Sequence, residues 1–235
     1  MKLGILLCGH VPEPLAPRFG DYAAMVQRLL DPAHQVSCFD VTAGVLPASA
    51  ESCDAFVLTG SPAAVYDELP WIAPLADFVR SARGRAKLVG ICFGHQMMAH
   101  AFGGRVVKAP QGWGIGLHRY ALPHRAAWMD DADMVVAPAS HQDQVVECPA
   151  DAGVVAQSVF TPFAGLDYGD AISFQFHPEF SAAFGVALIE SRRDLYGARG
   201  QAAIDSYTRP HDGARVARWI GRFLQMPMAA MRPAA

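Results

Sequence analysis

Residues 87–104 read KLVGICFGHQMMAHAFGG, and this stretch decides the fold that the sequence predicts. The composition of residues 87–91 is typical of a strand buried on both faces, and residues 94–102 have the pattern of a helix. The pair Gly103-Gly104 is a typical end for that helix. The central segment Gly90-Ile91-Cys92-Phe93-Gly94 therefore predicts a cysteine on a sharp strand-to-helix turn, between glycines that allow close backbone approach.

The cysteine on this turn, Cys92, is a candidate nucleophile. The positive end of the following helix dipole favours thiolate over thiol, and the N–H of Phe93 is placed to donate to an oxyanion. The alternative is a buried core cysteine, since free cysteine is among the most buried residue types. Four other cysteines lack the pattern and are expected in the core, although Cys8 ends a strand and could border the same site; they are Cys8, Cys38, Cys53 and Cys148.

Outward from this stretch, short apolar runs alternate with helical patterns, which predicts a mainly parallel sheet with helices on both faces. On the N-terminal side, strands are expected at 2–8, 35–40 and 55–59, and helices at 21–30 and from 70 to about 82. Beyond residue 104, Gly, Pro and Asp separate short runs at 105–107, 116–122, 134–138, 144–148 and 154–159. Such runs predict a small antiparallel or mixed sheet. A late core strand at 171–176 and helices at 180–192 and 213–226 complete the pattern.

Length and composition limit the class of protein. The 235 residues are 52% hydrophobic and 17% charged, which fits one α/β domain spanning 1–235 with a frayed tail from about Pro227. The net charge of −3 implies no basic surface, so nucleic acid is not an expected partner. No apolar run approaches the roughly 20 residues that cross a bilayer. Five scattered cysteines without a C-x-x-C pair favour reduced thiols and a cytoplasmic protein.

A thiol nucleophile needs a base, and His177 is the best placed of the nine histidines. It follows the apolar segment SFQF at 173–176, so it lies just past a strand, at the sheet edge where the cysteine turn is also expected. Glu179 can bond one imidazole nitrogen and leave the other for the thiol. The triplet His177-Pro178-Glu179 alone also fits a surface turn. Together with the cysteine turn it predicts a nucleophile, a base and an orienting carboxylate.

Two segments, GICFGHQMMAHAFGG from Gly90 and SFQFHPEF from Ser173, closely resemble the catalytic signatures of class I glutamine amidotransferases. The resemblance is closest to stand-alone relatives of the GMP synthase glutaminase domain. Other segments also resemble this subgroup, in the same order: FGDY at 19–22, TGSPAAVYD at 59–67, PWI at 70–72, GWGIG at 112–116 and SHQD at 140–143. The resemblance implies the flavodoxin-like amidotransferase fold and hydrolysis of a γ-glutamyl amide through a thioester, without a cofactor.

The resemblance also implies residue roles. Cys92 is expected to be the nucleophile, His177 the base and acid, and Glu179 the orienting carboxylate. Gly60 is expected to supply a second oxyanion N–H beside that of Phe93. Residues expected to bind the glutamyl group are Gln96, Trp113, Gly114, Ser140 and His141. SHQD stands where the synthase has SHGD, which leaves loop detail and partner contacts open.

Three functions remain open at this point. The protein is a γ-glutamyl peptide hydrolase that needs no synthetase, a non-catalytic regulatory or binding protein on the same scaffold, or a glutaminase that passes ammonia to a separate synthetase subunit. No P-loop pattern appears, so ammonia is expected to pass to another chain or be released. No metal is expected, because His95 and His100 are five positions apart on one helix and His141 has Asp143 nearby but no third ligand.

Overall fold

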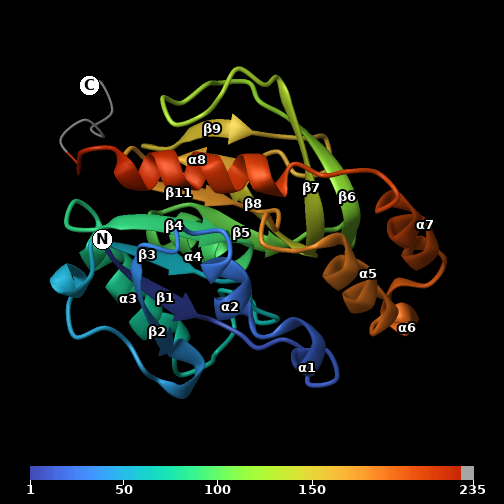
Figure 1. The fold of residues 1–235 in the computed structure, drawn as a ribbon, viewed down its shortest axis with the longest axis horizontal. Helices are drawn as coiled ribbons and strands as arrows, with labels where there is room; N and C mark the ends of the chain where they lie inside the picture. The colour runs from blue at the N-terminus through green and yellow to red at the C-terminus, as the bar shows by residue number, and fades with distance from the viewer. Residues whose placement is uncertain (229–235) are drawn as a thin grey trace.

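Seven strands form a central sheet in the order β2-β1-β3-β4-β11-β10-β9, in a computed structural model that describes residues 1–228 (Figure 1). The parallel strands are β1 (Lys2–Leu7), β2 (Gln35–Asp40), β3 (Ala55–Leu58), β4 (Lys87–Ile91) and β11 (Ala171–Phe174). β10 (Gly165–Asp167) runs antiparallel to its neighbours β11 and β9 (Gly153–Ala156). The expectation of a frayed tail falls largely on residues 229–235, outside the described residues.

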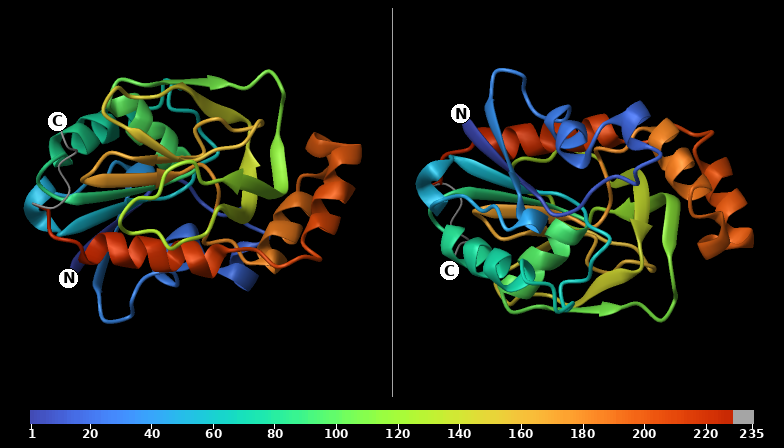
Figure 2. Two further views of the ribbon diagram at one scale, coloured as in Figure 1. Left: turned by 90° about the horizontal axis from the view of Figure 1, so that it is seen from above. Right: turned by 90° about the horizontal axis from the view of Figure 1, so that it is seen from below.

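Helices cover both faces of this sheet (Figure 2). α2 (Tyr22–Gln27) and α8 (Gly213–Gln225) lie on one face, and α3 (Ile72–Ala82) and α4 (Phe93–Ala101) on the other. Successive side chains of a strand point to opposite faces. In β1, Leu3 and Ile5 accordingly join the cluster under α2 and α8, while Leu6 joins the cluster under α3 and α4. The predicted parallel sheet, buried on both faces, is therefore confirmed.

Two two-stranded antiparallel sheets accompany the central sheet. β5 (Arg105–Lys108) pairs with β8 (Asp143–Glu147), and β6 (Gly114–Ala121) pairs with β7 (Met134–His141). Figure 1 shows α5 (Ala182–Glu190), α6 (Arg193–Tyr196) and α7 (Ala198–Ser206) beside the β6–β7 pair. The run predicted at 154–159 differs from expectation, because its first part, β9, pairs with β10 at the edge of the central sheet.

Several boundaries differ from the predicted ones for local reasons. α2 begins where Asp21 accepts a hydrogen bond from the N–H of Ala24, and it ends at Gln27, followed by tight turns. α5 begins at Ala182 because the Ser181 side chain caps it, so residues 177–180 stay outside the helix. The remaining elements are short: α1 (Ala16–Phe19), η1 (Val41–Ala43) and η2 (Ala50–Ser52). No helix within residues 1–228 is both long enough and apolar enough to span a bilayer.

Candidate active site

Three loops meet at the carboxyl edge of the parallel strands: the turn after β3 with Gly60, the turn after β4 with Cys92, and the segment after β11 with His177. Backbone hydrogen bonds connect these segments. The N–H of Cys92 donates to the carbonyl of Phe174 at the end of β11, at 2.8 Å. The N–H of His177 donates to the carbonyl of Pro138 in β7, also at 2.8 Å. The cysteine and the histidine are therefore positioned by adjacent strands.

Cys92 lies on a strained turn. Its φ of 53° makes it the one non-glycine residue with positive φ in the part of the chain that the structure describes. Such a conformation costs about 1–3 kcal/mol and persists only where the surroundings enforce it. Both flanking glycines are required by close contacts. A Cβ on Gly90 would come within 2.6 Å of the Gly94 carbonyl oxygen, and a Cβ on Gly94 within 2.5 Å of the Leu58 carbonyl oxygen.

His177 and Glu179 form a buried pair. The Nδ1 atom of His177 lies 2.6 Å from Oε1 of Glu179, and the two side chains are 4% and 1% exposed. The Phe180 ring stacks on the imidazole with centroids 3.9 Å apart and an interplanar angle of 11°, which fixes the ring orientation. The other nitrogen, Nε2, has no hydrogen-bond partner among the described residues, and Cys92 lines the same cavity as this ring.

The charge of the imidazole follows from these neighbours. Burial alone lowers the pKa of His177, but the charges of Glu179 and Cys92, together with the hydrogen bond to Glu179, outweigh that effect and raise the pKa to about 10. The imidazolium form is therefore favoured at neutral pH when the thiol is ionised. A protonated imidazole beside a sulfur can act first as an acid and then, after losing its proton, as a base.

The turn after β3 lies against both side chains. A Cβ on Gly60 would be 3.1 Å from Cε1 of His177 and 3.7 Å from Cβ of Cys92, so a larger residue there would press on the imidazole. The hydroxyl of Thr59 accepts from the N–H of Cys8 at 2.9 Å and donates to the Gly60 carbonyl at 3.1 Å. Cys8 is fully buried and lines neither cavity at the site, and burial raises the pKa of its thiol to about 12. The backbone of Cys8 therefore supports the Thr59–Gly60 turn through its hydrogen bond to Thr59.

Two N–H groups are available for an oxyanion. Phe93 is the first residue of α4, where a helix leaves its N–H groups unpaired. Within residues 1–228, no hydrogen-bond acceptor is found for the N–H of Phe93 or for that of Gly60. The two donors belong to turns at the ends of neighbouring strands, β4 and β3.

Cys92 lines two adjoining cavities. The larger, about 450 Å³, contains Cys92 and four residues predicted to bind the glutamyl group, namely Gln96, Trp113, Ser140 and His141. The smaller contains Cys92 together with Gly60 and His177. Gly114 lines neither cavity. It begins β6 opposite His141, and a Cβ there would come within 2.6 Å of the Phe160 ring.

In the larger cavity, the protonation of His141 and the orientation of the Gln96 amide are both fixed by their surroundings. Burial lowers the pKa of His141 to about 3, so its imidazole is neutral, and Nδ1 lies 3.2 Å from the carbonyl oxygen of Asp143. Nε2 of His141 is then the acceptor nitrogen. The amide nitrogen of Gln96 donates to the same Asp143 carbonyl at 2.8 Å and to Oε1 of Gln175 at 3.1 Å. Its carbonyl oxygen remains for a ligand.

Several residues at the site were not predicted. Tyr66 and Asp143 line the larger cavity, where the Tyr66 hydroxyl donates to the Asp143 carboxylate at 2.7 Å. Tyr22 lines the smaller cavity, and Arg192 lines both. The segments FGDY, TGSPAAVYD and SHQD contained the first three, without assigning them a role. In the sequence, Arg192 was simply the last residue of the helix predicted at 180–192, and nothing marked it as a site residue.

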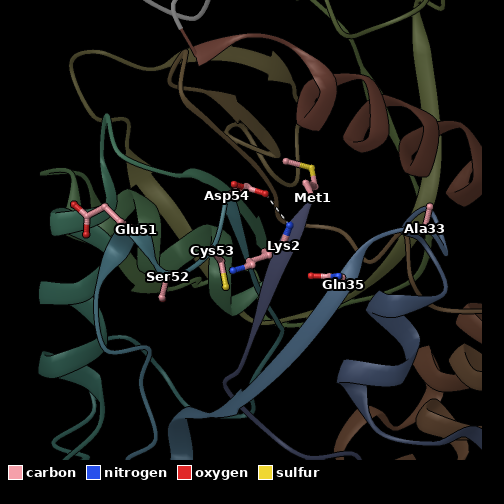
Figure 3. A pocket seen from close by; sticks show the side chains of 8 residues that line it. All are labelled: Met1, Lys2, Ala33, Gln35, Glu51, Ser52, Cys53 and Asp54. Atoms are coloured by element: carbon pink, nitrogen blue, oxygen red, sulfur yellow. Dashed lines mark hydrogen bonds between the residues drawn. The ribbon is translucent and has the colours of Figure 1, made fainter.

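A separate cavity of about 420 Å³ lies at the amino ends of β1 and β2, the opposite end of the strands (Figure 3). Its cysteine, Cys53, has no histidine among the lining residues, and burial raises the pKa of that thiol. The Asp54 carboxylate there accepts from the backbone N–H of Lys2 at 2.7 Å. This cavity lacks a nucleophile and base. Across residues 1–228, no group of three or more metal-ligating side chains is found.

The glutamine amidotransferase class-I family matches residues 22–190, and the chain belongs to this family. Its relatives include γ-glutamyl peptidase 4 of Arabidopsis thaliana, 30% identical over 172 residues, which are 69% of this chain and 68% of that protein. A glutamine-hydrolysing GMP synthase chain of Methanopyrus kandleri is 31% identical over 130 residues, covering 52% and 67%. A glutamine amidotransferase from Thermotoga maritima has the same fold, with a TM-score of 0.77, 20% identity and coverage of 95% and 99%.

Proposed function

We propose that the protein hydrolyses a γ-glutamyl amide through a thioester on Cys92. The observation that carries this proposal is a cysteine on a strained turn that shares a cavity with a histidine, whose far nitrogen is bonded to a buried glutamate. The substrate is glutamine or another γ-glutamyl compound. Nucleophile, base and orienting carboxylate are Cys92, His177 and Glu179.

The first half of the reaction forms the thioester. The Cys92 thiolate attacks the δ-carbonyl carbon, and the N–H groups of Gly60 and Phe93 hold the resulting oxyanion. Each such donor contributes about 3–4 kcal/mol to the transition state in comparable acyl transfers. The His177 imidazolium gives its proton to the departing nitrogen as the C–N bond breaks, which releases ammonia or an amine.

The second half regenerates the enzyme. His177, now neutral, takes a proton from water, and the hydroxide attacks the thioester carbonyl. The C–S bond then breaks and glutamate leaves, so the thiolate and the imidazolium return together. Glu179 stays ionised throughout and keeps Nε2 of His177 turned toward the sulfur.

The glutamyl group is assigned to the larger cavity. The acceptors there are the carbonyl oxygen of Gln96 and Nε2 of His141, which suit an ammonium group. Trp113, Gly114 and Ser140 complete the proposed subsite, with Gly114 acting from the adjoining backbone. A neutral His141 fits this role better than a charged one, because it does not repel the ammonium group.

The comparisons support two versions of this activity. Similarity to γ-glutamyl peptidase 4 favours a hydrolase that works without a synthetase, and similarity to the GMP synthase chain favours a glutaminase with a separate synthetase partner. The pure protein distinguishes them. Glutamate release from γ-glutamyl dipeptides without a partner supports the first version, whereas hydrolysis that needs an added synthetase supports the second.

The decisive test is Cys92→Ala, with Cys38→Ala as the matched control, because Cys38 is exposed and outside both cavities. We expect Cys92→Ala to remove glutamate release and to unfold at the same urea concentration as the parent, while Cys38→Ala keeps full activity. Undiminished turnover in Cys92→Ala contradicts the proposal. If the parent turns over no substrate and iodoacetamide leaves Cys92 unmodified, the non-catalytic alternative is favoured.

A further inference from the structure

Arg192 is the arginine that lines both cavities at the candidate site. It lies between α5 and α6, where its N–H donates to the carbonyl of Ile189 at 3.1 Å and its carbonyl accepts from the N–H of Leu195 at 3.0 Å. These bonds hold its backbone in a fixed turn. The side chain therefore extends toward the cavities from a defined position.

The guanidinium of Arg192 is not engaged by the part of the protein that the structure describes. Within residues 1–228, no ion pair or side-chain hydrogen bond of Arg192 is found. The adjacent Arg193, by contrast, lies 3.9 Å from the Glu190 carboxylate, and Arg215 lies 3.2 Å from that of Asp130. A guanidinium carries five donors in a planar fork that matches a carboxylate. An unpaired, half-buried arginine beside a nucleophile is thus suited to a carboxylate on a ligand.

The charge of Arg192 acts on Tyr22, a neighbour of Cys92 and His177 in the smaller cavity. Burial raises the pKa of Tyr22 in the smaller cavity, and Arg192 acts on the same hydroxyl in the opposite direction. Cys92 and Glu179 also act on that hydroxyl. Tyr22 therefore lies among the charges of Arg192, the nucleophile and the orienting carboxylate.

The two cavities differ in size, about 450 Å³ and about 20 Å³, so the smaller has room for little more than a departing nitrogen or a water molecule. Gln96 and His141 line only the larger cavity, which is assigned to the glutamyl group, and His177 lines only the smaller one. His177 delivers a proton to the departing nitrogen, so the leaving group lies on its side of the nucleophile. Arg192 borders this side as well as the larger cavity, so it can reach an anionic group near the departing nitrogen.

We propose that Arg192 binds the carboxylate of an amino-acid leaving group, so that γ-glutamyl amino acids are the preferred substrates over glutamine. In such a dipeptide the carboxylate is two bonds from the departing nitrogen, whereas the ammonia that leaves glutamine carries no carboxylate. This inference rests on the proposed hydrolysis at Cys92. It adds that the preferred amides are those of γ-glutamyl amino acids and that Arg192 is the residue that selects them.

The test compares γ-glutamylglycine with γ-glutamylglycinamide, which differ only in the carboxylate of the leaving group, and includes glutamine. The parent is expected to hydrolyse γ-glutamylglycine with a kcat/KM at least about 10-fold above the other two substrates, as expected for a charge-assisted hydrogen bond. Arg192→Met is expected to lose about 10- to 100-fold on γ-glutamylglycine alone. Arg193→Met, which removes the same charge one residue away, is expected to match the parent on all three substrates.

Two kinetic results overturn the inference, and one binding result does so as well. One is an equal loss on all three substrates in Arg192→Met, which assigns the guanidinium to the glutamyl carboxylate or to folding. The other is a parent that does not distinguish the acid from the amide, and that comparison needs no variant. Calorimetry on Cys92→Ala separates binding from turnover: equal Kd values for γ-glutamylglycine and its amide refute the role of Arg192. Absence of hydrolysis in every protein, with tighter binding of the acid, refutes the proposed function and leaves the Arg192 contact standing.

Discussion

The contact between Gly94 and β3 sets the position of the nucleophile, and Gly94→Ala tests it. A Cβ at this position would stand 2.5 Å from the carbonyl oxygen and 2.6 Å from Cβ of Leu58. Carbon and carbonyl oxygen atoms ordinarily stay about 3.3 Å or more apart, so α4 must withdraw from β3 by about 0.8 Å. The contacts are backbone and Cβ atoms, so no flexible side chain can absorb the clash.

The expected effect on stability is a net loss. Overpacking in a dense core costs about 1–3 kcal/mol, and replacing glycine by alanine within a helix returns about 0.5–1 kcal/mol. We therefore expect the free energy of unfolding to fall by about 1–2 kcal/mol in urea titrations. The effect on turnover is expected to be larger, because a misplacement of about 1 Å at a reacting group can cost 100-fold in rate.

Gly221→Ala is the matched control. Gly221 lies within α8, and no atom would lie within 4 Å of a Cβ placed there. The same substitution is expected to raise the free energy of unfolding by about 0.5–1 kcal/mol and to leave kcat/KM unchanged. The reasoning fails if Gly94→Ala is as stable and as active as Gly221→Ala.

Two further predictions concern charged groups. Between about pH 6.5 and the folded pKa of about 10, folded His177 holds a proton that the unfolded chain has released, so the free energy of unfolding falls as pH rises through this range. Glu179→Gln is expected to lower the pKa of His177 in an NMR titration and to flatten that fall; an unchanged slope contradicts it. Buried Lys87 donates to three carbonyls at the C-terminal end of α8, so Lys87→Met is expected to lower the free energy of unfolding in urea by about 1–3 kcal/mol. Lys108→Met, at an exposed position, is the control and is expected to show no such loss. Equal urea midpoints for the two variants would refute this.

The parallel part of the fold was predictable because its strands carry strong local signals. β2 and β4 match the predicted ranges of 35–40 and 87–91, and α3 ends at the predicted Ala82. The second half was less predictable. β10 is three residues long and is defined by pairing with β11 and β9, and α6 and α7 contain few buried residues. Short elements that depend on distant partners leave little periodicity in the sequence.

The predicted site residues divide in the same way. Cys92, His177 and Glu179 were found from turn chemistry and strand ends, which are local features, and their chemical roles stay predictions until the variants are measured. Arg192 was not predicted as a site residue, because its position depends on how α5 and α6 pack beside the cavities. An arginine in a helical pattern usually lies on a solvated face, and it is the position of Arg192 against both cavities that distinguishes this one.

Two close approaches connect the helix that follows Cys92 with β3, and the turn after β3 with the ring of His177. The Cα of Gly94 in α4 packs on Leu58, the residue before the Thr59–Gly60 turn, and Gly60 packs on the ring of His177. Protein interiors are dense, so a shift at any of these contacts passes to the next. Cys92, Gly60 and His177 are therefore expected to shift together. A substitution in β3 that touches no substrate, such as one at Leu58, must therefore change the reaction geometry as surely as one at Gly60.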